Sequence, residues 1–500
     1  MSNYSFDELG RQSPKGIVIN YGVLLYKLVK SFWVFIPIVF SDSIDNKLNY
    51  ILCLLAILAL VLLVVAVVQY LYFKFKIDGD YFILNQGMIF KKKTSIPLDR
   101  IQSVNFKQNL IHQLINVTQV EIQTAGAKDI EVSIKAISRQ KAEALKKRLQ
   151  NNIESVISDE VLNEVAEVNE GKLIYKLSII DLLKVSFSEN HIRSFFWIIA
   201  IVFSFSYQLR DYFKDFDFVG QAINYAVNNK SLFTGSLLLL GLAFVIGLII
   251  SIVVSFVRVF LRHFEQNVIK RNDGIQVSEG LFTRREDVLK IKKIQYSVTV
   301  TNPIKQKLGI QTIKIKQAGS AKTKKKKLVQ LVGVKNLFLS QLNQLFFNYE
   351  PTDNKETYKP SRYYLFRMFV RTFILLLIIN FVFFLNQLSI INWILANALI
   401  IPIAILMVLL KFKKTYFDFD GKTLLVGNGK IGTVTTIIEY FKTQNVTYSQ
   451  SFIQKRRGVA TLKLQTASGV IKLPCLHEED ARTIQERIVS EVEGSSKDWI

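Results

Sequence analysis

The chain alternates between long apolar runs and strand-forming stretches in which apolar and polar residues take turns. Three runs, residues 50–73, 231–257 and 393–410, contain no charged residue. Each is long enough to cross a bilayer as a helix. A weaker apolar run precedes each of them, at about residues 24–40, 192–209 and 368–385. The pattern therefore predicts six spans, arranged as three membrane hairpins.

A stretch of forty residues recurs without a gap after each hairpin, at 87–126, 280–319 and 429–468. Three columns of this alignment are identical and a fourth is always basic. The identical columns are Gly87, Gly280 and Gly429; Gln102, Gln295 and Gln444; and Ala125, Ala318 and Ala467. The basic column is Arg100, Lys293 and Lys442. The same structural unit is therefore present three times.

The periodicity within each unit indicates strands followed by a helix. Residues 118–124 (TQVEIQT) and their counterparts alternate apolar and polar positions, which is typical of a half-buried strand. The residues Asn85-Gln86-Gly87 have the composition of a hairpin turn. We interpret the glutamine column as structural, with each amide satisfying backbone groups inside its unit. A ligand contact at these glutamines is the alternative.

The net charge of +24 is concentrated in the repeated units. Residues 74–152 carry +7, residues 258–347 carry +14 and residues 411–490 carry +6. Basic residues follow the second span of every hairpin, which by the positive-inside bias predicts cytoplasmic units and termini. No secretory signal is visible in the polar first sixteen residues.

The densest basic segment is predicted to contact anionic lipid headgroups. Five lysines occupy one turn of the second unit, and two arginines lie at a neighbouring strand end. These residues are Lys322, Lys324, Lys325, Lys326, Lys327, Arg284 and Arg285. A basic residue near an anionic leaflet gains about 1 kcal/mol. The alternative is that these residues are solvated faces that reflect only the positive-inside bias.

No catalytic, cofactor or metal site is expected. The cysteines, Cys53 and Cys475, are too few for a metal cluster, and the four histidines are scattered. The segment from Gly427 to Gly432 formally matches G-x-G-x-x-G, but the β-branched residues after it favour a hairpin over a dinucleotide-binding helix. The spans also lack the buried carboxylates that ion transporters normally need.

Three features of the repeated stretch resemble the bacterial pleckstrin-homology-like domain. They are the glycine, the basic position and glutamine that follow it by thirteen and fifteen residues, and the strand ending in TAG or QAG. Paired spans before each unit, and LSIIDLLKVSFSEN after the first, resemble the YdbS/YdbT-like membrane proteins. The resemblance implies antiparallel barrels with a C-terminal helix, an inner-membrane location and no known enzymatic activity. It also implies a role in envelope stress or resistance to peptide toxins, and a small single-unit sister membrane protein as a partner. The third unit departs from the pattern at Gly427-Asn428-Gly429 and Arg456-Arg457.

The predicted fold class is an α+β integral membrane protein with three such units and three membrane hairpins. The hairpins are 24–73, 192–257 and 368–410, and the units are 74–152, 258–347 and 411–492. Outside them lie an N-terminal segment (1–23), an acidic linker with an interfacial helix (153–191), a plain linker (348–367) and a tail (493–500).

Three classes of function are compatible with this organisation. The first is a non-enzymatic protein of the bacterial inner membrane, whose cytoplasmic units bind lipid headgroups, each other or protein partners. The second is a component of a lipid or peptide transporter, and the third is an enzyme acting on lipids. We expect the first class, with no nucleic-acid partner. The sequence leaves the oligomeric state open.

Overall fold

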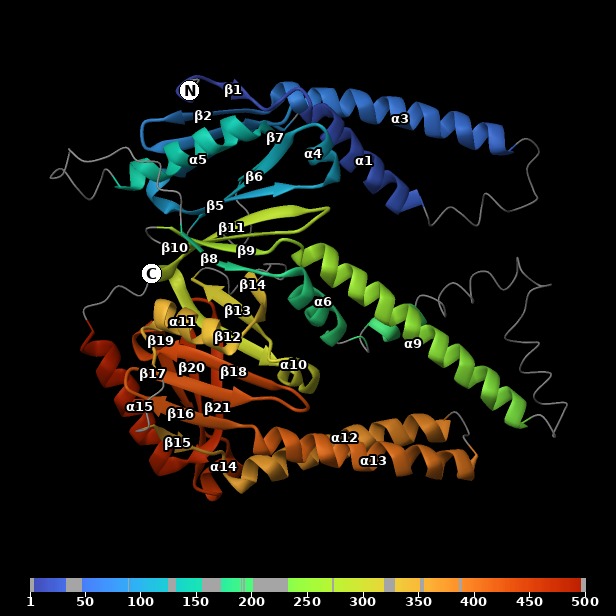
Figure 1. The fold of residues 1–500 in the computed structure, drawn as a ribbon, viewed down its shortest axis with the longest axis vertical. Coiled ribbons are helices and arrows are strands. Elements are labelled where there is room, and N and C mark those ends of the chain that lie inside the picture. The colour runs from blue at the N-terminus through green and yellow to red at the C-terminus, as the bar shows by residue number, and fades with distance from the viewer. Residues whose placement is uncertain are drawn as a thin grey trace.

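The computed structural model describes residues 4–32, 47–88, 90–124, 132–154, 172–189, 191, 194–200, 233–271, 274–318, 329–350, 355–385 and 389–495. A column of β-sheets forms the body of the molecule, and the long apolar helices project from one side of it (Figure 1). The arrangement places every described membrane helix on the same face of the column. The body is therefore placed at one surface of the bilayer.

Long helices account for four of the six predicted spans. They are α3 (Lys47–Tyr72), α9 (Phe233–His263), α12 (Arg362–Leu385) and α13 (Ile390–Lys413). Each contains at least twenty residues of sufficient length and hydropathy to cross a membrane, with few of their side chains buried by the rest of the chain. Residues 33–40 of the first predicted span and 201–209 of the third lie outside the described residues.

The third hairpin is joined by a polar contact at membrane depth. Asn380 of α12 and Asn397 of α13 exchange hydrogen bonds through their side-chain amides, at 3.1 and 2.8 Å. Interhelical amide pairs of this kind stabilise membrane helices against separation. The helix α13 continues through Pro402 as one element.

The first helix belongs partly to the first unit. It is α1 (Gly16–Phe32), and Ile19 near its start packs against Val117 and Ala136 of that unit. A second helix, α6 (Ile179–Ser188), covers the segment predicted to be interfacial. Its Ile179, Ile180 and Phe187 side chains are exposed although apolar, which is expected of a helix lying against lipid headgroups.

Each unit consists of two three-stranded halves and a closing helix. The first comprises β2 (Lys74–Asp78), β3 (Tyr81–Gln86), β4 (Lys92–Pro97), β5 (Ile101–Gln108), β6 (Val117–Thr124), β7 (Val132–Ser138) and α5 (Arg139–Glu154). The second comprises β9 (Asn267–Arg271), β10 (Gly274–Glu279), β11 (Arg284–Lys290), β12 (Ile294–Thr301), β13 (Gln311–Gln317), β14 (Val329–Val334) and α11 (Asn336–Phe347). The third comprises β16 (Tyr416–Asp420), β17 (Thr423–Asn428), β18 (Thr433–Glu439), β19 (Thr443–Ser449), β20 (Val459–Thr466), β21 (Gly469–His477) and α15 (Glu478–Glu493).

Smaller elements complete each unit in the same way. A single turn, α4 (Leu110–Leu114), α10 (Pro303–Lys307) or α14 (Phe452–Arg456), joins the first two strands of the second half. A short strand from the segment before each membrane hairpin pairs with the first strand of the following unit. These strands are β1 (Gly10–Arg11), β8 (Lys172–Lys176) and β15 (Glu356–Tyr358). Within the predicted linker over 348–367, residues 356–358 pair with the open edge of β16 as a short strand.

Apolar side chains on the inner faces of the strands form a separate core in each unit. In the first, Phe75, Phe82, Ile122 and Ile134 are fully buried beneath Leu145 of α5. The alternation read from the sequence matches these buried positions, as in β6, where every second residue from Val120 onward is buried. The predicted strands and closing helices are confirmed.

The units are joined by strand pairing rather than by flexible contact. Strand β5 of the first unit pairs antiparallel with β11 of the second, and β12 of the second pairs with β18 of the third. Two seven-stranded sheets result, in the orders β7-β6-β5-β11-β10-β9-β8 and β14-β13-β12-β18-β17-β16-β15. A four-stranded sheet, β1-β2-β3-β4, completes the first unit, and a three-stranded sheet, β19-β20-β21, completes the third.

The repeated turn glycines adopt a backbone that other residues resist. Gly87, Gly280 and Gly429 have φ of +91°, +103° and +144°, and follow the second strand of each unit. A Cβ atom at any of the three would collide with a backbone oxygen three residues later. The G-x-G-x-x-G match likewise lies on the β17–β18 hairpin, as expected.

The glutamine column is not uniform. Gln295 is fully buried, in agreement with a structural role, whereas Gln444 is exposed. The burial of Gln295 supports the structural interpretation in the second unit, whereas for the exposed Gln444 it stays a prediction. The side chain of Gln102 and the whole of Ala125 lie outside the described part of the structure.

The turn geometry predicts a matched pair of glycine variants. Gly280→Ala should lower the free energy of unfolding by about 1–3 kcal/mol, because an alanine is strained at this φ and its Cβ meets backbone. Gly309→Ala is the control, since Gly309 also has a positive φ of +65° but open space around it. Thermal unfolding of the detergent-solubilised chain compares the two, and equal losses would contradict the role of the backbone collision.

Candidate membrane-surface site

The turn between the second and third strands of each unit lies beside the end of a membrane helix. In the second unit, the backbone amides of Gly280 and Leu281 donate to the carbonyls of Phe264 and Leu261, at 2.9 and 3.0 Å. In the third, the Lys414 ammonium donates to the carbonyl of Gly432 at 3.1 Å. These bonds attach the strand turns to the ends of α9 and α13. The turns are therefore held at the level where the membrane helices leave the bilayer.

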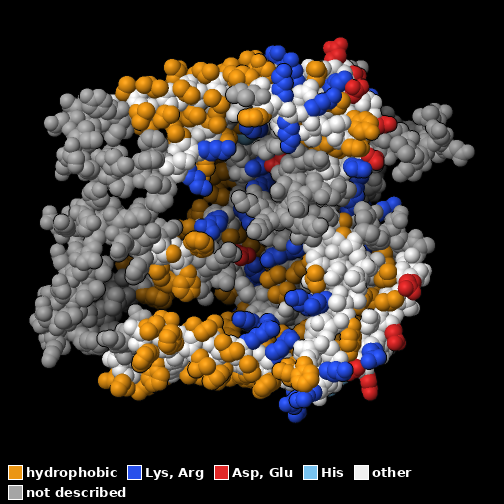
Figure 2. Space-filling model, turned by 180° about the vertical axis from the view of Figure 1, so that it is seen from behind, with side chains coloured by type: hydrophobic (Ala, Val, Ile, Leu, Met, Phe, Trp, Pro, Cys, Tyr) orange, Lys and Arg blue, Asp and Glu red, His pale blue; other side chains and the backbone are white. Residues whose placement is uncertain are grey.

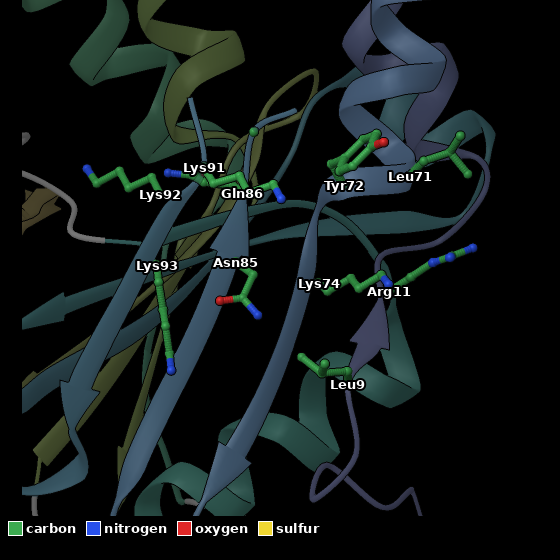
Figure 3. A pocket seen from close by; sticks show the side chains of 11 residues that line it. Leu9, Arg11, Leu71, Tyr72, Lys74, Asn85, Gln86, Lys91, Lys92 and Lys93 are labelled. Atoms are coloured by element: carbon green, nitrogen blue, oxygen red, sulfur yellow. The ribbon is translucent and has the colours of Figure 1, made fainter. Parts of the chain in front are cut away.

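In the first unit, this position holds a pocket. It has a volume of about 660 Å³ and lies between the end of α3, the β3–β4 turn and the N-terminal strand β1 (Figure 3). Five basic side chains line it together with Tyr72 and Leu71 of α3. The basic residues are Arg11, Lys74, Lys91, Lys92 and Lys93.

The pocket has the chemistry of an anion site. The other polar lining residues, Asn85 and Gln86, are uncharged amides, so no carboxylate among the described lining residues offsets the five positive charges. Lys92 and Lys93 follow one another in β4 and therefore point to opposite sides of the strand. In Figure 3, Lys93 points away from Tyr72, while Lys91 and Lys92 lie at the turn. The pocket thus has the lysines of the turn on one side and the end of the membrane helix on the other.

Exposed apolar side chains accompany the basic residues at these turns. Phe90 is 89% exposed and Met88 is 45% exposed. The corresponding turns of the other units expose Leu281, Phe282 and Ile431. Apolar residues at a turn flanked by lysines fit an interface between hydrocarbon and headgroups. In Figure 2, lysine and arginine side chains gather where the apolar helices meet the body.

The predicted headgroup contacts are placed differently. The lysine run, Lys322 and Lys324 to Lys327, lies outside the described residues. Arg284 is exposed and forms an ion pair with Glu265 at 3.5 Å. Arg285 lies opposite Lys107 of the first unit, in the pairing of β11 with β5. The two arginines are thus at a junction between units, and their contact with lipid stays a prediction.

The basic column serves three different environments. Arg100 is exposed, and burial lowers the pKa of Lys293. Lys442 is buried and donates to the carbonyl of Lys292, 2.6 Å away in the second unit. The three residues of the basic column thus share a positive charge but not an environment. In the third unit, the charged Lys442 links that unit to the second.

Sequence reasoning missed the pocket of the first unit. Lys91, Lys92 and Lys93 are consecutive and follow the turn glycine, which is a visible signal. The contributions of Arg11 and Tyr72 are not visible in sequence, because β1 and the end of α3 reach the turn only through the fold.

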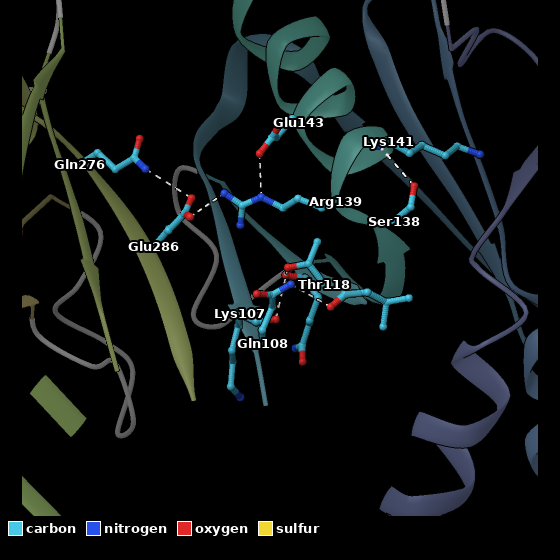
Figure 4. Close-up of polar contacts among 11 residues, drawn as sticks. Lys107, Gln108, Thr118, Ser138, Arg139, Lys141, Glu143, Gln276 and Glu286 are labelled. Carbon is cyan, nitrogen blue, oxygen red and sulfur yellow. Dashed lines mark hydrogen bonds and ion pairs between the residues drawn. The ribbon is translucent and has the colours of Figure 1, made fainter. Parts of the chain in front are cut away.

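Ion pairs also connect the first two units. Arg139, the first residue of α5, forms an ion pair with Glu286 of β11 at 2.6 Å and another with Glu143 at 2.6 Å (Figure 4). The Asn105 side-chain oxygen accepts from the Val288 amide at 3.2 Å, again across the junction. Side chains therefore reinforce the pairing of β5 with β11.

One carboxylate at this junction is destabilised by its surroundings. Burial, followed by the negative charge of Glu279, raises the pKa of Asp287 to about 6. Glu121 of the first unit acts in the same direction, and Arg285 partly opposes them.

Among the described residues, no group of three His, Cys, Asp or Glu side chains is placed to hold a metal ion. His263 instead contacts Glu279 at 2.7 Å, and His112 contacts the carbonyl of Lys135 at 3.0 Å.

The repeated units match one known domain family. The bacterial PH domain matches residues 28–153, 221–338 and 373–492. The chain belongs to the bacterial PH domain family. It is 25% identical over 419 residues to the UPF0699 transmembrane protein YdbT of Bacillus subtilis (strain 168), covering 79% of this chain and 80% of that protein. No solved structure matches the chain. It is thus a transmembrane member of the family and resembles YdbT, as the sequence pattern predicted.

The position of Asp287 predicts a pH dependence of stability. Its pKa is about 6 in the folded chain against an ordinary value of 3.8. Stability from this group is therefore full below pH 3.8 and is lost as pH rises through 6. Asp287→Asn should stabilise the chain at pH 7 by about 2–3 kcal/mol and flatten the change between about pH 4 and 6.

Thermal unfolding of the detergent-solubilised chain at about pH 5 and about pH 7 measures this effect. Asp99→Asn, at an exposed position of the first unit, provides the control for the same chemical change. A variant at Asp287 that retains the parental pH dependence would contradict the role of this carboxylate.

Proposed function

We propose that the chain is a non-enzymatic protein of the bacterial inner membrane that binds anionic lipid headgroups on its cytoplasmic side. The observation that supports this most strongly is the pocket lined by Arg11, Lys74 and Lys91 to Lys93 beside the end of α3. A phosphate group of a lipid fits this chemistry, because its negative charge enters a pocket lined by basic residues without a carboxylate, while its acyl chains stay beside the membrane helix. The further proposal is that such binding serves envelope maintenance or resistance to toxic peptides.

The cytoplasmic orientation is supported by charge. Lys74, Arg258 and Lys411 follow the ends of successive membrane runs, and similar clusters are absent from the sequence of the predicted loops on the other side. The anionic cytoplasmic leaflet would then face the basic turns. The lysine run at 322–327 and the exposed Arg284 are proposed as additional contacts with the same leaflet, and a small single-unit sister protein as a partner.

Charge removal at the turn should weaken headgroup binding. Two lost charges, each worth about 1 kcal/mol near an anionic surface, predict roughly thirty-fold weaker binding for the Lys91→Gln/Lys92→Gln variant at low salt. The measurement is titration of the full chain, held in neutral-lipid nanodiscs, with a short-chain phosphatidylglycerol below its micelle concentration. The same titration with inorganic phosphate distinguishes a lipid site from a free-phosphate site.

The matched control is Lys147→Gln/Arg148→Gln. It removes the same charge from exposed positions in the same unit, on the part of α5 that lies away from the membrane helices (Figure 1). Its binding should change by less than about threefold. Equal losses in both double variants, or equal binding of a short-chain phosphatidylcholine, would overturn the headgroup proposal.

The orientation has its own test. A reporter fused after Lys414 should give a cytoplasmic signal in a bacterial host, because this lysine lies at the end of α13 on the side of the body. A fusion after Leu385, the last residue of α12 and at the opposite end of the third hairpin, should give a periplasmic signal. The reverse pattern would overturn the proposed orientation without affecting the fold.

A further inference from the structure

The two junctions between units use one register. Arg284 lies opposite Gln108, Arg285 opposite Lys107 and Glu286 opposite Phe106 at the first junction. Moving each of these positions by the repeat offset gives Thr433 opposite Thr301, Val434 opposite Val300 and Thr435 opposite Thr299. Those are the pairs found at the second junction. The pairing is therefore a property of the repeated unit and not of one particular sequence.

In the described part of the chain, one sheet edge of the first unit and one of the third take no strand from another unit. In the described part of the chain, β4 pairs with β3 and β19 pairs with β20, and each forms the end of its sheet. By position in the repeat, β4 corresponds to β11 and β18, and β19 corresponds to β5 and β12. Each terminal edge is thus of the kind that another unit covers elsewhere in the same chain.

The edge of β19 invites pairing. Its sequence, TQNVTYS, contains no charge and no proline, and Val446 to Ser449 are half-buried. Lysines, prolines and bulges are the usual means of blocking an exposed edge. Its bulge, between Thr443 and Asn445, has counterparts in β5 and β12, which nevertheless pair with another unit. Because the described strand has no lysine or proline, its outer backbone groups from Asn445 to Ser449 are available as a template for another strand.

The side chains at the two ends are complementary in charge. At the first junction, Arg139 begins α5, pairs within its helix with Glu143, and reaches across to Glu286. The equivalent first residue of α15 is Glu478, which pairs within its helix with Arg482 at 2.9 Å. The position equivalent to Glu286 in the first unit is Lys93, an exposed residue of β4. Every sign is reversed, so Glu478 and Lys93 match as Arg139 and Glu286 do.

We propose that β19 of one copy of this chain pairs antiparallel with β4 of a second copy, in the register of the internal junctions. The predicted pairs are Asn445 with Ile96, Val446 with Ser95, Thr447 with Thr94, Tyr448 with Lys93, Ser449 with Lys92, and Gln450 with Lys91. An ion pair between Glu478 and Lys93 accompanies them.

The membrane permits this head-to-tail contact. All described membrane helices project from one side of the column, and the column axis runs across them (Figure 1). A second copy that directs its helices toward the same side as those of the first can occupy the same bilayer. The contact joins two different surfaces, so it continues as a row or closes as a ring.

Cysteine cross-linking in native membranes tests the register. A chain with Thr94→Cys and a differently tagged chain with Thr447→Cys are co-expressed, both carrying Cys53→Ser; the remaining Cys475 is fully buried. Mild oxidation should give a disulfide-linked product containing both tags, because directly opposed strand residues bring their Cβ atoms within disulfide reach. Replacing Thr94→Cys by Lys147→Cys, on exposed α5, should give less than about a tenth of that product, since its Cβ lies outside this reach. Equal or absent cross-linking of the Thr94 pair would overturn the proposal.

A charge exchange tests the ion pair. Lys93→Glu in the Thr94→Cys chain should reduce the cross-linked product at least about fivefold, since like charges then oppose each other, and Glu478→Lys in the Thr447→Cys chain should restore it. Lys92→Glu is the matched control, because it makes the same charge change on the opposite face of β4. Any loss of cross-linked product that it causes should not be restored by Glu478→Lys. Failure of the specific rescue, or a product formed by the Thr447→Cys chain with another protein instead of with its own kind, would overturn the proposed contact between copies.

Discussion

Backbone hydrogen bonding between strands of different units is the constraint on which this architecture depends. A strand at the edge of a sheet presents unpaired amide and carbonyl groups, and these need partners. Here β5 supplies them to β11, and β12 supplies them to β18. Separating the second unit from its neighbours would expose two edges at once. The three units therefore form one continuous column, from which the membrane helices extend.

The junctions share a register but not their side chains. The first uses an ion pair, Arg139 with Glu286, while the second uses the hydroxyl pair Thr301 and Thr433 at 2.5 Å and the buried Lys442. The backbone ladder sets the register, and side chains add specificity on top of it. A diverging repeat can exchange one kind of contact for another as long as the ladder is kept.

The sequence predicted the features that arise within one unit. The turn glycines, the alternating strands and the closing helices depend on local periodicity and on a backbone conformation that Gly280 tolerates, so they are visible in the alignment. The junctions are not, because nothing in the pattern of β11 or β18 states which strand lies beyond its outer edge. Gln444 shows the same limit: it is identical to Gln295 in sequence, yet one is exposed and the other buried. The pocket of the first unit depends on Arg11 and Tyr72, which are distant in sequence from the lysines they join.

Three copies of one fold need not do the same thing, because position along the column changes what each copy offers. In the second and third units, hydrogen bonds attach the strand turn to the membrane helix, whereas in the first unit a basic pocket occupies the corresponding place. In the middle unit, β11 and β12, which correspond to β4 and β19, are both paired with strands of the neighbouring units. Lys92 and Pro97 on β4 resemble the devices that block indiscriminate edge pairing. A charged edge of this kind favours a partner that brings the opposite charge over one that merely adds a strand. The first and third units, rather than the middle one, therefore carry the groups that can distinguish one ligand or partner from another.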